Sequence, residues 1–441
     1  MNQHLSLASQ ILLTARRNGL RAGQDNTVDV LVRIQAPDAP DAVVAARPPQ
    51  AIALVLDRSG SMQGRPLDEA RRCAEFVISR LRPTDTVSVV QFDNRVERLR
   101  PAVALGDGDA LRAAIASIHT GGNTNLHGGW LDGADSLASV PGAGLKRVIV
   151  LSDGCANEGL TDSAEIAAQC AAWAAKGITT STYGLGKHFN EELMVAMARA
   201  GGGNHYYGDT AEDLMEPFQQ ELDLLANLAL RQVELSVSVP DGLCVQMLNE
   251  LPTVEAGWRL PDLAWGAEAW AILRVTVPAG ALPGLGERMT LLRISVTGQS
   301  LQGEAVALEK AGLALPVLSP SAFDALVEDE LVQRRSAELA AGLFLTQMRS
   351  AAHAHDWAAV DGMLVDARKR FAGNEWVSGI LEAMAVLAQS RSRERMMKEA
   401  MYSSSKLSNR LTAKDEVAFS VVADAGPAYL RRKRQQGKGE L

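Results

Sequence analysis

The chain has 441 residues, 47% hydrophobic and 22% charged, which is typical of a globular protein with roughly two or three domains. Its 44 Lys and Arg and 52 Asp and Glu give a net charge of −8, so we expect no nucleic-acid partner. No apolar run reaches the roughly 18 residues of a transmembrane helix, and the first residues lack the pattern of a signal peptide. The four cysteines include no CxxC pair, and we expect a reduced, cytoplasmic protein with no transmembrane segment.

The first regular pattern lies near the N-terminus. Val28, Val30, Val32 and Ile34 alternate with mostly polar residues, which predicts a β-strand with one buried face. We expect this strand to join later strands in a sandwich, with an α/β domain inserted between them. The alternative is that it forms an additional edge strand of the α/β sheet.

Residues 48–227 alternate short apolar runs with helical patterns. In residues 67–81, for example, apolar side chains recur at helical spacing. Near-continuous apolar strands separated by helices indicate an α/β fold with a doubly wound, mostly parallel sheet covered on both faces. A binding site in such a fold lies beyond the carboxyl ends of the strands. The predicted strands are 52–56, 86–92, 147–151 and 178–184.

The rest of the chain shows two further sequence patterns. Residues 231–316 show period-two alternation broken by Pro and Gly, which predicts a small antiparallel β-sandwich region. From Pro320 onward, amphipathic stripes predict a C-terminal helical domain. After Met401 the sequence is serine-rich and then basic, and we expect this tail to fray or to dock only with a partner. The expected domains are an N-terminal segment 1–47, the α/β domain 48–227, the β domain 228–318, the helical domain 319–402 and the tail 403–441.

The strongest local signal is Asp57-Arg-Ser-Gly-Ser61, between an apolar strand and a predicted helix. A carboxylate and two hydroxyls at positions i, i+2 and i+4 place three oxygens around one point, and Gly60 permits the tight turn. Oxygen ligands alone suit a hard cation, Mg²⁺ first, with Mn²⁺ or Ca²⁺ as alternatives. Taken alone, this loop has the competing interpretation of a turn that caps the next helix.

Two further segments place oxygens at the same predicted edge. Asp153 follows the strand at 147–151, and Thr124 lies in a glycine-rich loop before a helix. Other polar residues have simpler interpretations: Asp93 is a turn residue, and His353, His355 and Asp356 are a solvated helix end. The candidate metal site therefore consists of Asp57, Ser59, Ser61, Thr124 and Asp153.

The D-x-S-x-S run, the downstream T-N-L-x-x-G and the strand ending in S-D-G resemble the metal-ion-dependent adhesion site of von Willebrand factor A (VWA) domains. The resemblance covers about 180 residues, and the domain order is similar to bacterial VWA proteins and to inter-alpha-trypsin inhibitor heavy chains. It implies that Ser59 and Ser61 coordinate the metal directly. It also implies that Thr124 does so when a ligand is bound, with Asp57 and Asp153 acting partly through water.

The function implied is a metal-dependent protein-protein interaction module and not an enzyme. An Asp or Glu of a protein partner would fill the open position of the metal, and the chain would act either with that partner alone or as part of a larger assembly. The rival hypothesis is a Mg²⁺-dependent phosphoryl-transfer enzyme with Asp57 as nucleophile, similar to haloacid dehalogenase-like phosphatases. That chemistry needs a second carboxylate two residues later, and this chain has Ser59 there.

Overall fold

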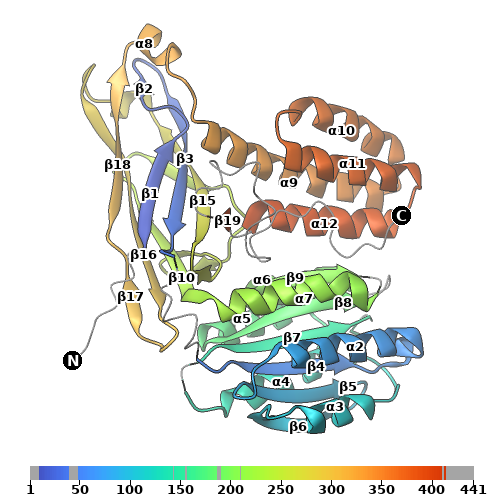
Figure 1. Cartoon of the computed structure of the whole chain (residues 1–441). Helices are drawn as coiled ribbons and strands as arrows, with labels where there is room; N and C mark the ends of the chain where they lie inside the picture. Colours follow the sequence, from blue (N-terminus) through green and yellow to red (C-terminus); the bar gives the residue numbers. More distant parts are fainter. Residues whose placement is uncertain are drawn as a thin grey trace, which may run out of the picture.

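The computed structural model describes residues 9–38, 48–142, 144–153, 156–185, 190–208, 210–409 and 412–413. These residues form three bodies (Figure 1): an α/β body, a two-sheeted β region and a helical bundle. The fold class predicted from the sequence, a doubly wound α/β domain with an antiparallel β region and C-terminal helices, is confirmed. None of the described helices combines the length and the apolar character needed to cross a lipid bilayer.

The α/β body is built on a six-stranded sheet in the order β6-β5-β4-β7-β8-β9. Its four central strands are parallel to one another and buried on both faces, and three of them are rich in apolar residues. They are β4 (Ala51–Asp57), β5 (Thr86–Phe92), β7 (Lys146–Ser152) and β8 (Ile178–Leu185).

The two edge strands of this sheet were not among the predicted strands. β6 (Val96–Ala104) runs antiparallel to β5, is largely exposed, and contains Pro101 and three charged residues. β9 (Gly202–Gly208) is parallel to β8 and begins with two glycines. Edge positions tolerate Pro and charge because one side of the strand needs no ladder partner. Such strands therefore lack the apolar pattern by which the central strands are found.

Helices cover both faces of the sheet. One buried cluster joins Ile52, Leu54 and Leu56 to α2, α3 and α7, and another joins Ala53 and Val55 to α4, α5 and α6. Alternate residues of β4 thus serve opposite cores, as the pleat of a strand requires. The helices are α2 (Arg65–Arg80), α3 (Asp109–Ala116), α4 (Leu126–Ala138), α5 (Ser163–Ala175), α6 (Glu191–Ala200) and α7 (Ala211–Ala226).

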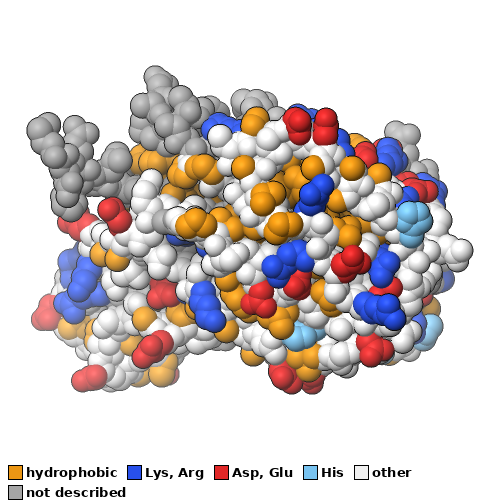
Figure 2. Space-filling view, turned by 90° about the horizontal axis from the view of Figure 1, so that it is seen from below, with side chains coloured by type: hydrophobic (Ala, Val, Ile, Leu, Met, Phe, Trp, Pro, Cys, Tyr) orange, Lys and Arg blue, Asp and Glu red, His pale blue; other side chains and the backbone are white. Residues whose placement is uncertain are grey.

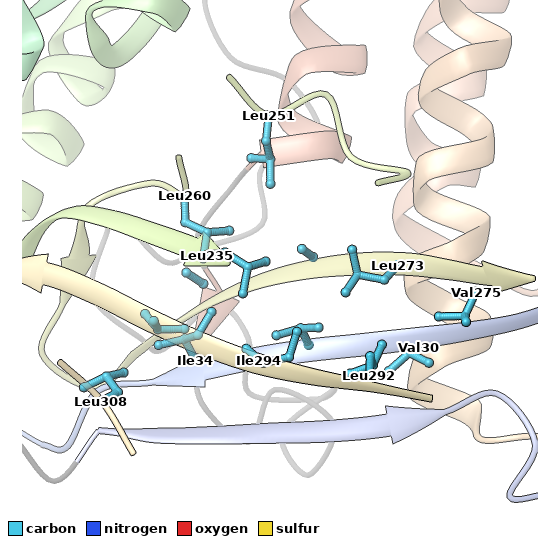
Figure 3. Packing of buried hydrophobic residues seen from close by; sticks show 14 of the residues in the cluster. Val30, Ile34, Leu235, Leu251, Leu260, Leu273, Val275, Leu292, Ile294 and Leu308 are labelled. Carbon is cyan, nitrogen blue, oxygen red and sulfur yellow. The ribbon is translucent and has the colours of Figure 1, made fainter. Parts of the chain in front are cut away.

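The β region consists of two sheets with a shared hydrophobic core (Figure 3). One sheet has the order β1-β3-β15-β11 and the other β12-β13-β10-β16-β18-β2. The strands are β1 (Gln10–Ala15), β2 (Leu20–Arg21), β3 (Asn26–Gln35), β10 (Leu228–Ser238), β11 (Cys244–Met247), β12 (Thr253–Val254), β13 (Gly257–Arg259), β15 (Ala267–Val277), β16 (Arg288–Gln299) and β18 (Ala311–Leu318).

The strand near the N-terminus pairs within this β region. β3 lies antiparallel to β15 from Asn26 opposite Val277 to Gln35 opposite Glu268. Its alternating side chains Val28, Val30, Val32 and Ile34 all enter the sandwich core. The α/β body therefore sits in the chain between β3 and β10, and α7 leads into β10 through Asn227 alone.

The helical bundle differs from expectation at two places. The first amphipathic segment after Pro320 is broken into two helices, α8 (Pro320–Asp324) and α9 (Glu330–His353). The break arises because Asp329 caps α9, accepting hydrogen bonds from the backbone N–H groups of Leu331 and Val332 at 3.0 Å. The remaining helices are α10 (Trp357–Arg370), α11 (Glu375–Gln389) and α12 (Arg393–Asn409).

The boundary expected at residue 402 falls inside α12, which continues to Asn409. In the serine-rich stretch of α12, Ser403 and Ser404 are buried and Ser405 is exposed. Ser403 Oγ donates to Glu399 at 3.1 Å, and Ser404 Oγ donates to the Gly342 carbonyl of α9 at 3.0 Å. Leu407 is fully buried. The basic part of the expected tail, residues 414–441, lies outside the described residues.

The surface of the α/β body on the β6 and α3 side carries charges of both signs (Figure 2). Lys and Arg side chains lie beside Asp and Glu, with hydrophobic side chains gathered between them. Among the described residues on this face, neither sign of charge forms a continuous field. A surface of this kind favours local, paired contacts over long-range steering of a charged polymer.

Candidate metal site

Asp57 is the last residue of β4 and is completely buried. Its Oδ1 accepts a hydrogen bond from the backbone N–H of Ser59 at 2.8 Å, and its Oδ2 accepts one from the hydroxyl of Ser152 at the end of β7. Burial raises the pKa of Asp57 to about 6; the hydrogen bonds from Ser152 and Ser59 act against this, and the charge of Asp153 adds to it. A cation beside this carboxylate would favour its ionised form.

The two serines and the second aspartate form a short chain of oxygens. Ser59 Oγ and Ser61 Oγ lie 3.1 Å apart, and Ser61 Oγ donates to Asp153 Oδ1 at 2.9 Å. Ser59 and Asp153 are buried and Ser61 is exposed, so the middle oxygen of the chain faces the surface and its two ends lie inside the fold. Residues 92 positions apart in the sequence meet here, because β4 and β7 are parallel neighbours.

Thr124 belongs to the third loop of the site and is 3% exposed. Its backbone N–H donates to Asn157 Oδ1 at 2.8 Å, and its carbonyl accepts from the Asn157 N–H at 3.1 Å. The same loop is tied to the first one, because Gly60 N donates to the Gly122 carbonyl at 2.8 Å. The structure thus brings the loops of the five predicted residues together at one edge of the sheet.

Asp93 is a buried residue of this edge that we interpreted from sequence as a simple turn residue. Its Oδ2 accepts from the Gly122 N–H at 3.1 Å and pairs with the Arg58 guanidinium at 3.1 Å. A Cβ on Gly121 would lie 1.7 Å from the same oxygen, so only glycine fits there. Asp93 therefore holds the Thr124 loop against the Asp57 loop. The signal that could have found it is its position directly after β5, the strand beside β4.

Asn157 and Ser152 are two further polar residues missed from the sequence. Each forms a hydrogen bond with a predicted site residue: Asn157 Oδ1 accepts from the Thr124 N–H, and the Ser152 hydroxyl donates to the Asp57 carboxylate. The histidine group behaves as a helix end, as interpreted: His353 ends α9, and Asp356 caps α10 by accepting from the Ala359 N–H at 3.0 Å.

The oxygen set fits a small hard cation. In octahedral coordination with bonds of about 2.1 Å, neighbouring ligand oxygens lie about 3.0 Å apart. The separations of 3.1 Å and 2.9 Å along the chain Ser59, Ser61 and Asp153 match that spacing. Within the described ranges, no three His, Cys, Asp or Glu residues gather as a metal site. This edge offers two carboxylates and neutral hydroxyls instead, a set suited to Mg²⁺ with retained water.

Comparison with known proteins agrees with this fold. A family model for the von Willebrand factor type A domain matches residues 51–221. An uncharacterized protein of Synechocystis is 28% identical over 189 residues, 43% of this chain and 44% of its own. The inter-alpha-trypsin inhibitor heavy chain H1 of Sus scrofa is 28% identical over 197 residues, 42% of this chain and 21% of its own. The matched region is thus less than half of each of these two relatives.

Two solved structures resemble nearly the whole chain. A von Willebrand factor type A protein from Catenulispora acidiphila has a TM-score of 0.70 at 14% identity and covers 91% of this chain and 98% of its own. The ArnB paralog VWA2 from Sulfolobus acidocaldarius has a TM-score of 0.61 at 16% identity, covering 91% and 99%. At these identities the likeness shows the fold alone. Together, the fold, the loops at its carboxyl edge and the family match show that residues 51–221 of this chain form a VWA domain.

Proposed function

We propose that the chain is a metal-dependent protein-binding module and that Mg²⁺ at the carboxyl edge of the VWA sheet grips an acidic side chain of a partner. The observation that carries this proposal is the chain of oxygens from Ser59 through Ser61 to Asp153, spaced at 3.1 and 2.9 Å beside buried Asp57. In this proposal Ser59 and Ser61 bind the ion directly. Asp57, Thr124 and Asp153 complete its surroundings, partly through water.

Charge supports a carboxylate as the incoming ligand. Two aspartates balance one divalent ion, and the hydroxyls of Ser59 and Ser61 add no charge, so the ion keeps its attraction for a further anion. Three arginines flank the site: Arg95 is exposed, Arg65 is exposed and forms an ion pair with Glu69, and Arg58 pairs with Asp93. A partner that presents Asp or Glu would find complementary charge around the metal.

The phosphoryl-transfer hypothesis is not favoured. A nucleophilic aspartate must face its substrate, whereas Asp57 is fully buried and both of its oxygens accept hydrogen bonds. The residue two positions later is Ser59, which cannot act as the acid and base of such a reaction. The proposed compartment is the cytoplasm; it is supported by Cys73, Cys170 and Cys244, which form no disulfide among the described residues.

The test has two readouts. Isothermal titration measures Mg²⁺ binding, and a pull-down from native lysate is run with Mg²⁺ and with chelator. We compare wild type with Ser61→Ala, with the double variant Asp57→Ala/Ser59→Ala, and with Ser79→Ala. Ser79 is a matched control because its side chain is exposed and its hydroxyl donates to the Phe76 carbonyl within α2.

We expect the wild type and Ser79→Ala to bind Mg²⁺ and to retain a partner only with the metal present. The site variants should lose both properties while unfolding at temperatures close to that of wild type. A partner retained equally in chelator and by the site variants would refute the proposal, as would wild-type protein that binds no Mg²⁺.

A further inference from the structure

The helical bundle is attached to the two other bodies in different ways. Val332 and Leu339 of α9 form a buried apolar cluster with Leu31, Trp270 and Ile272 of the β region. Among the described residues, Tyr402 is the one bundle residue in the buried apolar clusters of the α/β body. Separating apolar surfaces exposes them to water, whereas separated polar groups regain hydrogen bonds there. The bundle and the β region therefore form one unit, to which the α/β body is attached more loosely.

Polar contacts hold the α/β body to this unit on the bundle side. Figure 1 shows α12 along the side of the α/β body that carries α6 and β9. The Tyr207 hydroxyl of β9 donates to Glu399 of α12 at 2.6 Å, and Arg349 of α9 pairs with Glu192 of α6 at 2.6 Å. Tyr207 and Glu399 are buried, whereas Glu192 is 70% exposed. The Tyr207 hydrogen bond is therefore the stronger of the two contacts.

A further polar contact holds the α/β body on the β-region side. The side-chain Nε2 of Gln232 in β10 donates to the carbonyls of Ala174 and Ala175 at 2.8 and 3.1 Å. These carbonyls belong to the last turn of α5, so Gln232 closes the end of a helix in the neighbouring body. The backbone of Gln232 is left-handed, with a φ of 51°, and such strain persists where the surrounding contacts hold it.

The junction of the three bodies is incompletely packed. A cavity of about 160 Å³ lies there, lined by Gly203 of β9, Leu260 of the β region and Ser405 of α12 among others. Two buried atoms of residues beside it, Asp262 Oδ2 and Arg259 Nε, have no hydrogen-bond partner within the described part of the chain. Interiors that stay closed are filled and their polar atoms are paired. An unfilled junction with unpaired polar atoms is typical of a contact that opens.

The chain passes from the α/β body into the β region through one residue. α7 ends at Ala226 and β10 begins at Leu228, so Asn227 is the whole connection. A small apolar cluster that includes Leu145, Leu225 and Leu228 surrounds this point. The α/β body has hydrophobic cores of its own on both faces of its sheet, so it moves as a unit. A residue between two elements is where a hinge absorbs a change of backbone angles.

We propose that the α/β body is hinged at Asn227 and swings as a rigid body away from the unit formed by the β region and the bundle. The structure shows the closed state, in which Tyr207 and Gln232 bridge the junction. In the open state Tyr402 and the walls of the cavity meet water, while the apolar cluster around Asn227 stays in contact. The motion needs no metal, so it stands independently of the proposed Mg²⁺ site.

The test compares two neighbouring tyrosines of β9 in the full chain. The Tyr207 hydroxyl crosses the junction, whereas the Tyr206 hydroxyl donates to Glu221 at 3.3 Å within the α/β body. Tyr207→Phe and Tyr206→Phe therefore remove the same group, each from a buried carboxylate, and both keep the ring. The two variants differ in whether the lost hydrogen bond joins two bodies or lies inside one.

Tyr402 reports the open state. It is 9% exposed and packs against the core of the α/β body, and burial raises its pKa. Tetranitromethane attacks the phenolate form of tyrosine, so Tyr402 reacts when the junction is open and its hydroxyl meets water. Its nitration rate, read by mass spectrometry of the peptide that contains it, therefore follows the open population. Hydrogen exchange of the α12 amides is measured alongside.

We expect Tyr207→Phe to raise the nitration rate of Tyr402 about tenfold or more, because losing a hydrogen bond to a charged group changes an equilibrium constant by about that factor. Tyr206→Phe should leave the rate within about twofold of the wild type. Hydrogen exchange within α12 should stay at the wild-type rate in both variants, since the bundle stays folded as the hinge opens.

Two outcomes would overturn the hinge. Equal nitration of Tyr402 in Tyr207→Phe and Tyr206→Phe would show that the Tyr207 contact does not hold two bodies together. Faster nitration accompanied by faster hydrogen exchange throughout α12 would show that this helix unfolds and the α/β body does not swing.

Gln232 gives an independent variant on the other side of the junction. Asn tolerates a left-handed backbone, but its shorter side chain does not reach the α5 carbonyls. Gln232→Asn should also speed nitration of Tyr402, and the double variant with Tyr207→Phe should exceed either single change. Gln246→Asn is the matched control, an exposed glutamine of β11 in the same β region. Should Tyr207→Phe fold poorly, wild-type nitration of Tyr402 in a folded Gln232→Asn protein would refute the hinge.

Discussion

Gly121→Ala tests whether Asp93 holds the Thr124 loop in place. The backbone of Gly121 does not have a positive φ, so alanine brings no conformational strain there. The conflict is one of space, because the new Cβ would lie 1.7 Å from Asp93 Oδ2 and 2.7 Å from its Cγ. Either the carboxylate or the loop must move by more than an ångström. Movement breaks the 3.1 Å contacts of Asp93 with the Gly122 N–H and with Arg58.

The expected magnitude follows from these contacts. Overpacking a filled site costs about 1–3 kcal/mol, and losing a hydrogen bond to a charged group costs about 1.5–3 kcal/mol. We expect Gly121→Ala to lower the free energy of unfolding by about 3 kcal/mol after partial relaxation. Because the moved loop carries Thr124, Mg²⁺ affinity should fall by about tenfold or more.

The assay is urea unfolding followed by circular dichroism, combined with Mg²⁺ titration. Gly362→Ala is the control, since a Cβ at that position in α10 meets no atom within 4 Å. Alanine there should stabilise the helix by up to about 1 kcal/mol and leave Mg²⁺ binding unchanged. Wild-type stability and Mg²⁺ affinity in Gly121→Ala would refute the role assigned to Asp93.

Three further predictions concern the buried polar groups. Glu221 is 0% and Arg147 2% exposed, so Glu221→Gln leaves the charge of Arg147 buried without a counter-ion. The free energy of unfolding in urea should fall by about 3–5 kcal/mol, and a fall of less than about 1 kcal/mol would contradict this prediction. Burial raises the pKa of Glu191 to about 7, so the folded state holds its proton more tightly than the unfolded state. The contribution of Glu191 to the free energy of unfolding is fully present below about pH 4.5 and is lost as the pH rises through 7, a loss of up to about 3 kcal/mol. Glu191→Gln should remove this decline, and identical stability profiles against pH for the two proteins would count against it. Asn249→Ala removes the 2.7 Å hydrogen bond to the Ser408 carbonyl of α12. It should lower the free energy of unfolding by about 2 kcal/mol and speed proteolysis within α12, and an unchanged cleavage rate would contradict this.

The sequence predicts the strands of the α/β sheet that are buried on both faces. Strand β4 has no polar residue before Asp57, and its pattern admits few other interpretations. The edge strands lack that pattern, because β6 needs charges on its open side and β9 needs glycines for close packing. A Cβ on Gly203 would lie 2.1 Å from the Thr180 carbonyl. The charges of β6 and the glycines of β9 are required by the position of each strand in the sheet, so the local sequence of these strands shows no strand pattern.

In the candidate site, too, some residues are marked by the local sequence and others only by the pairing of strands. Asp57, Ser59 and Ser61 could be predicted because their spacing lies within one loop, and Thr124 and Asp153 because of their glycine-rich or strand-end context. Asp93 resembles any turn aspartate until the pairing of β5 with β4 places it beside Gly121 and Gly122. The end of α12 was misjudged because its serines are polar. Each of the described hydroxyls at 403, 404 and 408 is engaged inside the fold.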